Sequence, residues 1–279
     1  MIITEEHNKN NKDIKTNIIY FTSACNLACT YCYEHLKDAE KNTMSREDLI
    51  KAADNTFKRE PEDQQTFFIL FGGEATLRWE DVKFFMDYCY SKKENVQFNM
   101  ISNGIRFLDD NFTRDYLSNN HYQDGRLALD ISFDGMEGNS DRIYPNGKDS
   151  SSDMLAILSK FKLIRLQYRL RYTVHLKNLH VFTDDILKII KHFSPHRVIL
   201  GVVNEQFGVN EDVLYRIGEE KLKTLWNKQE LKTPICELFC DTCNGCTIHR
   251  DNLSLYTDSK EIQRPLVSTG LFDDFKYKE

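Results

Sequence analysis

The chain has 279 residues, of which 41% are hydrophobic and 29% charged, so it can build a core and is not a disordered polymer. Its 37 basic and 43 acidic side chains give a net charge of −6, which argues against bulk binding of nucleic-acid backbones but not against modification of a single nucleotide. No run of about 18 apolar residues occurs, so no membrane span is expected. The polar start of the chain lacks the apolar region of a signal peptide, and we therefore expect a cytoplasmic protein.

Six strands, each followed by a helix, are predicted in chain order. The strands are expected at 17–24, 65–73, 95–103, 126–135, 168–176 and 197–203. The helices are expected from about Ser45, over 79–94, from about Asp109, and over 151–164, 183–193 and 211–228. This alternation predicts an α/β fold with a parallel sheet. Six units are too few for a closed eightfold barrel, so a partial barrel competes with a doubly wound sheet.

Three of the predicted strands carry polar side chains on one consistent face. These side chains are Gln97, Asn99 and Asn103, then Asp130, Ser132 and Asp134, then Arg169, Arg171, Thr173 and His175. One interpretation is the interior of a barrel that holds a polar ligand, and the other is an exposed edge of the sheet. We favour the interior, because the helix after each strand should cover the outer face.

A first group of cysteines follows the first strand. Cys25, Cys29 and Cys32 form a C-x3-C-x2-C pattern, and clustered thiols in a reducing compartment indicate metal ligation or redox chemistry. Soft thiolates select zinc, Cu(I) or iron–sulfur clusters. Structural zinc takes four ligands, whereas three thiolates match a 4Fe-4S cluster with one open iron. Zinc, or three core thiols grouped by chance, are the alternatives.

This cysteine pattern, with Tyr31 before its last cysteine, resembles the loop of radical S-adenosylmethionine (SAM) enzymes. Three further matches follow in order: FGGE at 71–74, ISNG at 101–104, and SFDG at 132–135 with Asp141-Arg142 after it. The string CNLACTYCYE looks most like the branch that includes sulfatase-maturing and peptide-modifying enzymes. The resemblance implies a partial (β/α)6 barrel and covers about residues 17 to 205. One departure is Ala75, where this branch usually has proline.

The resemblance also implies cofactors and site residues. SAM would chelate the open iron, and its ammonium group would meet the carbonyls of Gly72 and Gly73 and the Glu74 carboxylate. Either of two arginines would pair with the SAM carboxylate. The candidate SAM contacts are Tyr31, Gly72, Gly73, Glu74, Asn103, Ser132, Arg142 and Arg171. An electron donor such as flavodoxin or ferredoxin would start SAM cleavage to a 5′-deoxyadenosyl radical, which takes a hydrogen atom from the substrate.

A second group of cysteines lies near the end of the chain, at Cys236, Cys240, Cys243 and Cys246. Four thiolates suffice for a complete second 4Fe-4S cluster or for a zinc site, with His249 as a spare ligand. A hairpin is expected over 247–259. The arrangement resembles the SPASM and twitch extensions of radical SAM enzymes, with more compact spacing. Cys89 stands alone on an amphipathic helix and is expected to be a packing residue.

These patterns predict a flexible start (1–16), a partial barrel (17–230) and a cysteine-rich extension (231–279). We expect an oxidoreductase or modifying enzyme of the radical SAM type whose substrate is a peptide or protein side chain. A small molecule, nucleoside or sugar held by the polar interior is the second hypothesis. A non-catalytic zinc-binding interaction module is the third.

Overall fold

A parallel sheet organises the molecule. The computed structural model describes residues 16–32, 42–136, 138–203, 208–228, 230, 233, 235 and 236. Its strands are β1 (Thr16–Tyr20), β2 (Thr66–Phe71), β3 (Val96–Ser102), β4 (Leu127–Phe133), β5 (Arg169–Val174), β6 (Arg197–Val202) and β7 (Ile235–Cys236). They lie in the sheet in the order of the sequence, and every neighbouring pair is parallel. In a doubly wound sheet the strand order changes direction at a point inside the sheet, and here it does not. The expected partial barrel is therefore confirmed.

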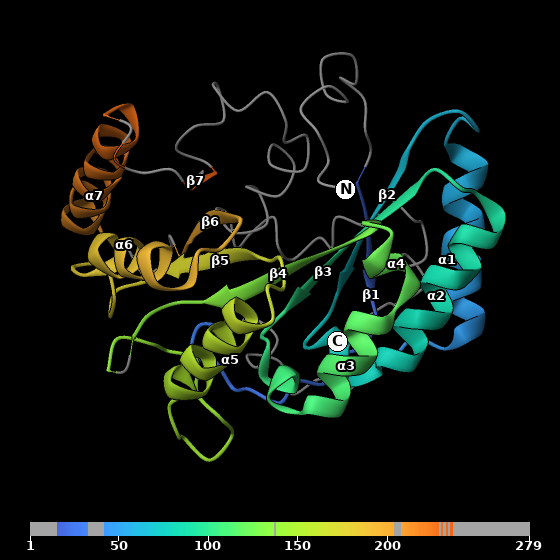
Figure 1. The fold of residues 1–279 in the computed structure, drawn as a ribbon, viewed down its shortest axis with the longest axis horizontal. Helices are drawn as coiled ribbons and strands as arrows, with labels where there is room; N and C mark the ends of the chain where they lie inside the picture. Colours follow the sequence, from blue (N-terminus) through green and yellow to red (C-terminus); the bar gives the residue numbers. More distant parts are fainter. Residues whose placement is uncertain are drawn as a thin grey trace.

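Helices follow the outer side of the curved sheet, from α1 to α7 (Figure 1). They are α1 (Arg46–Arg59), α2 (Trp79–Lys92), α3 (Asp110–Ser118), α4 (Asn120–Gln123), α5 (Ser151–Leu163), α6 (Phe182–Phe193) and α7 (Val209–Asn227). Two 3-10 turns, η2 (Ala75–Arg78) and η3 (Ile105–Leu108), precede α2 and α3. None of the described helices combines the length and apolar character needed to cross a membrane.

Two predicted helix starts are confirmed by their caps. The Ser45 side chain accepts a hydrogen bond from the Asp48 N–H (3.1 Å), and Asp109 accepts one from the Asn111 N–H (2.8 Å). The first strand ends earlier than predicted, at Tyr20 rather than at 24. Beyond it, Thr22 forms an isolated antiparallel bridge with Thr43, so the chain has already left the sheet.

The core lies between the sheet and the helices. Alternate side chains of the strands point into it, such as Phe68, Phe98, Leu129 and Leu170, each at most 2% exposed. Because the helices pack against these apolar side chains on the outer side, the alternate side chains of β3 to β5 lie on the inner face of the curved sheet. The predicted polar face is therefore the inner face, and the exposed-edge interpretation is wrong, because Asn99 and Asp130 are 0% exposed.

The strand β7 was not predicted. Its two residues extend the sheet beyond β6, where Cys236 is in register with Ile199. The second cysteine group therefore begins on the sheet itself. Residues 237–279, with Cys240, Cys243, Cys246 and the expected hairpin, lie outside the described residues.

Candidate functional site

The three cysteines of the first group lie on the loop that leaves β1 at its carboxyl end. Cys29 is 7% exposed, and Cys25 and Cys32 are half-buried. Burial, with smaller contributions from the neighbouring cysteines, raises the pKa of Cys25 to about 12 and that of Cys29 to about 11. Two donors lie against the sulfurs: Asn103 Nδ2 is 3.5 Å from Cys25 Sγ, and Arg142 Nη1 is 3.7 Å from Cys29 Sγ. We call residues 21–32 the cysteine loop.

The residues after β2 hold the first half of this loop. The Gly73 N–H donates to the Thr22 carbonyl (2.7 Å), and the Glu74 N–H donates to the Ala24 carbonyl (2.9 Å). A Cβ on Gly72 would stand 2.5 Å from the Thr22 oxygen, and one on Gly73 would stand 2.6 Å from the Ala24 oxygen. The two glycines are therefore required by close backbone approach, which a simple strand-to-loop turn does not demand.

The Glu74 carboxylate joins the ends of β2 and β3. It accepts hydrogen bonds from the Thr76 N–H (3.1 Å) and hydroxyl (2.6 Å), the Ser102 hydroxyl (2.9 Å) and the Asn103 N–H (2.7 Å). Burial raises the pKa of Glu74, because all four of these donors are uncharged. The Asn103 side chain then donates to Asn26 Oδ1 (2.7 Å) on the cysteine loop. Through these hydrogen bonds, Glu74 and Asn103 connect the ends of β2 and β3 to the cysteine loop.

The segment after β4 holds the second half of the cysteine loop. The Ala28 N–H donates to the Ile143 carbonyl (2.7 Å), and the Thr30 N–H donates to the Asp141 carbonyl (3.1 Å). Asp141, which belongs to the matched motif, and Ile143 just after it therefore support the loop through their carbonyls. Together with the glycines after β2, they grip the loop from two sides.

Tyr31 reaches the same segment through its side chain. Its hydroxyl donates to Asp134 Oδ2 (2.8 Å), while Asp134 Oδ1 accepts from the Ser140 hydroxyl (2.6 Å). The Arg142 guanidinium lies 5.8 Å from the centre of the Tyr31 ring. Burial alone would raise the pKa of Asp134, but nearby His175, Arg142 and Ser140 hold it below its usual value.

The inner face carries a second buried cluster, around Asp130 on β4. Asp130 accepts from Arg169 Nε (2.5 Å), Arg171 Nη1 (3.3 Å) and Asn99 Nδ2 (3.0 Å). Burial would raise the pKa of Asp130, yet the two guanidinium groups lower it. Of the two arginines expected near SAM, Arg142 therefore lies at the cysteine loop and Arg171 lies with Asp130. Ser132, 9% exposed, is in register with Arg171.

Several residues that build the site were missed by sequence reasoning. They are Asn26, Thr76, Ser102 and Ser140, whose side chains bond Asn103, Glu74 or Asp134. The sequence offered one indication, which is that each is a small polar residue inside or beside a motif. Their partners lie on other strands, which a single sequence does not pair.

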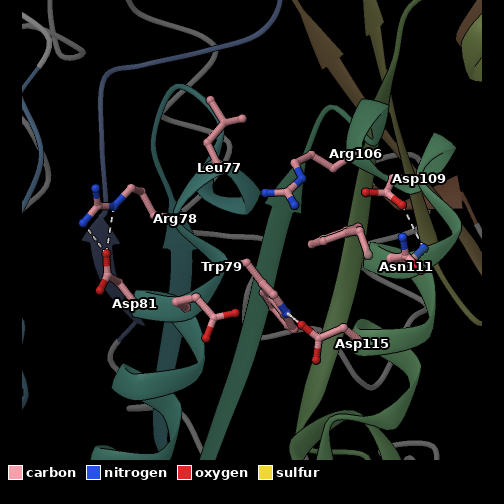
Figure 2. Close-up of a pocket in the computed structure, with 10 residues that line it drawn as sticks. Leu77, Arg78, Trp79, Asp81, Arg106, Asp109, Asn111 and Asp115 are labelled. Carbon is pink, nitrogen blue, oxygen red and sulfur yellow. Dashed lines mark hydrogen bonds and ion pairs between the residues drawn. The ribbon is translucent and has the colours of Figure 1, made fainter.

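A surface pocket of about 570 Å³ lies near the amino ends of α2 and α3. Figure 2 shows Trp79 directed at Asp115 and Arg78 directed at Asp81. Trp79 Nε1 donates to Asp115 Oδ2, and Arg78 Nε donates to Asp81 Oδ2, each over 2.8 Å. None of the lining residues belongs to the predicted site. We assign this pocket no role in the cysteine site.

The comparisons with known proteins agree with this geometry. Residues 19–123 match the model of the Radical SAM superfamily. The uncharacterized protein MJ0907 of Methanocaldococcus jannaschii is 26% identical over 224 residues, which are 78% of this chain and 68% of that protein.

Solved structures of low identity share the fold. Native anSMEcpe with bound AdoMet has a TM-score of 0.61 at 18% identity, covering 80% of this chain and 64% of that one. Native anSMEcpe with bound AdoMet and Cp18Cys peptide has a TM-score of 0.60 at 17% identity, covering 78% and 62%. The chain thus spans less than two thirds of these solved chains. The part of the chain that is similar to the Radical SAM superfamily, residues 19–123, contains the cysteine loop and the strands β2 and β3.

Proposed function

We propose that this chain is a radical SAM enzyme that modifies a peptide or protein side chain. One observation carries the proposal: the three cysteines lie on a single loop, gripped from two sides at the carboxyl ends of β1 to β4. In parallel barrels this edge is where ligands bind and react. The polar inner face lies directly beneath it.

The donor set fits a 4Fe-4S cluster. Cys25, Cys29 and Cys32 would each ligate one iron, so three sulfurs need not surround one ion. Among the described residues, no three Cys, His, Asp or Glu side chains lie close enough to hold a single metal ion. Burial keeps the first two thiols protonated when no cluster is present, so cluster binding would release their protons.

The residues around the loop suit the two ends of SAM. Glu74, whose hydrogen-bond donors Thr76, Ser102 and Asn103 are uncharged, would accept from the SAM ammonium together with the carbonyls of Gly72 and Gly73. Arg142 would face the SAM carboxylate, and Tyr31, Asn103 and Ser132 would contact the rest of the molecule. With one electron from an external donor such as flavodoxin or ferredoxin, a bound cluster would supply the reductive cleavage of SAM to methionine and a 5′-deoxyadenosyl radical, which would take a hydrogen atom from the substrate.

The substrate class has two candidates. A peptide is supported by the shared fold with anSMEcpe, one structure of which has a bound Cp18Cys peptide. A small polar molecule such as a nucleoside or sugar is favoured by the inner face, where Asn99, Asp130, Arg169 and Arg171 offer donors and acceptors. Turnover of each substrate class by the reconstituted protein would separate them.

SAM cleavage tests the function directly. The full chain, reconstituted with iron and sulfide without oxygen and reduced with dithionite, should convert SAM to 5′-deoxyadenosine. Cys29→Ala should abolish this conversion. Cys89→Ala is the matched control. Cys89 is buried on α2, so its substitution should leave SAM cleavage unchanged. No iron in the reconstituted chain, or no SAM cleavage, would refute the enzyme.

A second measurement concerns the cysteine group at the end of the chain, which we propose holds an auxiliary 4Fe-4S cluster. In a triple Cys25, Cys29 and Cys32 to alanine variant, about four residual irons per chain would support that cluster. Bound zinc without iron would instead indicate a structural site.

A further inference from the structure

A buried polar cluster lies where β4 and β5 end. Asp134 is 1% exposed and His175 is 0% exposed. His175 Nε2 lies 3.5 Å from Asp134 Oδ2, and its Nδ1 lies 3.2 Å from Asp141 Oδ2. The Tyr31 hydroxyl donates to the same Asp134 oxygen. One aspartate oxygen is thus approached by both the tyrosine and the histidine.

His175 lies between two carboxylates, with one ring nitrogen beside each. Neither of its ring nitrogens makes a hydrogen bond of acceptable geometry, although both lie beside carboxylates. The imidazole therefore links Asp134, at the end of β4, with Asp141 in the segment that supports the cysteine loop. Its ring packs against the Tyr31 ring, with centroids 5.5 Å apart and planes tilted by 31°.

Both carboxylates beside His175 belong to the support of the cysteine loop. Asp134 binds the Tyr31 hydroxyl, and the Asp141 carbonyl accepts from the Thr30 N–H (3.1 Å). His175 therefore backs the tyrosine that stands between Cys29 and Cys32. Removing the imidazole would leave space behind the Tyr31 ring and separate the two carboxylates from their common neighbour.

We propose that Asp134 and His175 are positioning residues for the cysteine loop. They fix the Tyr31 ring, and through it they set where the thiols of Cys29 and Cys32 lie before a cluster binds. The proposed radical SAM function is the reason this position would matter. The first test does not depend on that function.

Thiol labelling of the cluster-free full chain measures the position of the loop. Each cysteine would be followed by mass spectrometry during reaction with iodoacetamide, in wild type, His175→Gln, Asp134→Asn and Tyr31→Phe. We expect Cys29 and Cys32 to react about tenfold faster in the variants, the factor expected from losing one hydrogen bond to a charged group. Tyr31→Phe removes one hydroxyl only, so it remains informative if the other variants fold poorly.

Two controls separate loop release from global destabilisation. Cys89, 0% exposed on α2, reacts only when that region opens, so its rate should not change. His121→Gln is the matched variant: His121 is also buried beside an aspartate, Asp87, but it precedes β4 at the other end of the strands. Equal acceleration of Cys29 and Cys89, or no acceleration at all, overturns the proposal.

Cluster spectroscopy extends the test. In reconstituted protein, the Asp134 and His175 variants should change the midpoint potential and the paramagnetic resonance spectrum of the reduced cluster, whereas His121→Gln should change neither. Unaltered potential and spectrum in both variants would overturn the positioning role. A wild-type chain that assembles no cluster, yet shows the labelling difference, would refute the proposed function and support the positioning role.

Discussion

Two buried carboxylates, one just beyond the end of β2 and one on β4, have pKa values shifted in opposite directions. Glu74 follows β2 and is 1% exposed, and Asp130 lies on β4 and is 0% exposed. Burial pushes the pKa of each upward as the largest single effect. Only Asp130 ends with a lowered pKa. Exposure alone therefore does not decide how these groups ionise.

The difference lies in the charge of the partners. Glu74 accepts from hydroxyl and backbone N–H groups, which lower its pKa too little to offset burial. Asp130 faces two guanidinium groups, and their charge reverses the effect. The negative charge of Asp130 is thus compensated by arginines within its own cluster. The Glu74 cluster keeps a carboxylate without a bonded cation beside the cysteine loop, which suits it to a cationic ligand.

The largest effect is expected for Asp130→Asn. The amide has nearly the same shape but no charge, so it leaves Arg169 and Arg171 facing each other without their shared anion. Breaking a buried ion pair in this way should lower the free energy of unfolding by about 3 to 5 kcal/mol. Urea denaturation followed by circular dichroism measures it. A loss below about 1 kcal/mol, the range of exposed pairs, would contradict this charge compensation.

A smaller effect is expected for Glu74→Gln. The glutamine keeps one oxygen for the Thr76 and Ser102 hydroxyls, but its amide nitrogen would face the Asn103 N–H, so one buried donor loses its acceptor. The cost should be about 1 to 3 kcal/mol in the same assay. Because Asn103 also contacts the cysteine loop, this variant should reduce iron incorporation, whereas Asp130→Asn should reduce it less. Equal iron loss in both would remove the distinction between the clusters.

Much of this architecture was predictable from local sequence patterns. Period-two alternation placed Asn99, Asp130 and Arg171 on one face, and the cysteine spacing located the loop. Alternation along a strand shows which side chains share a face of the sheet, but it does not show which residues on other strands they contact. The pairing of Asp130 with Arg169 follows from strand register, and the bond from Tyr31 to Asp134 joins residues 103 positions apart.

The glycines show the same limit at a finer scale. Sequence reasoning assigned Gly72 and Gly73 through their carbonyls, as acceptors for SAM. The structure adds a use of the missing Cβ and of the Gly73 N–H, both of which serve the approach of the Thr22–Ala24 backbone. Close approach between backbone segments depends on tertiary geometry, and a Gly-Gly pair in the sequence does not indicate which segment will pack against it.

The smallest and most selective effect is the pH dependence of stability. The folded pKa of Asp130 lies below its unfolded value of about 3.9, so its contribution is complete above about pH 4 and is lost as the pH falls through the folded value. The folded pKa of Glu74 lies above its unfolded value of about 4.3, so its contribution is complete below about pH 4 and is lost as the pH rises through the folded value. Urea denaturation across the acid range should therefore show the wild type and Asp130→Asn converging as the pH falls, and the wild type and Glu74→Gln converging as it rises. Parallel curves for either variant would mean that its carboxyl group titrates alike in the folded and unfolded chain, and the contrast between the two clusters would then rest on hydrogen bonding alone.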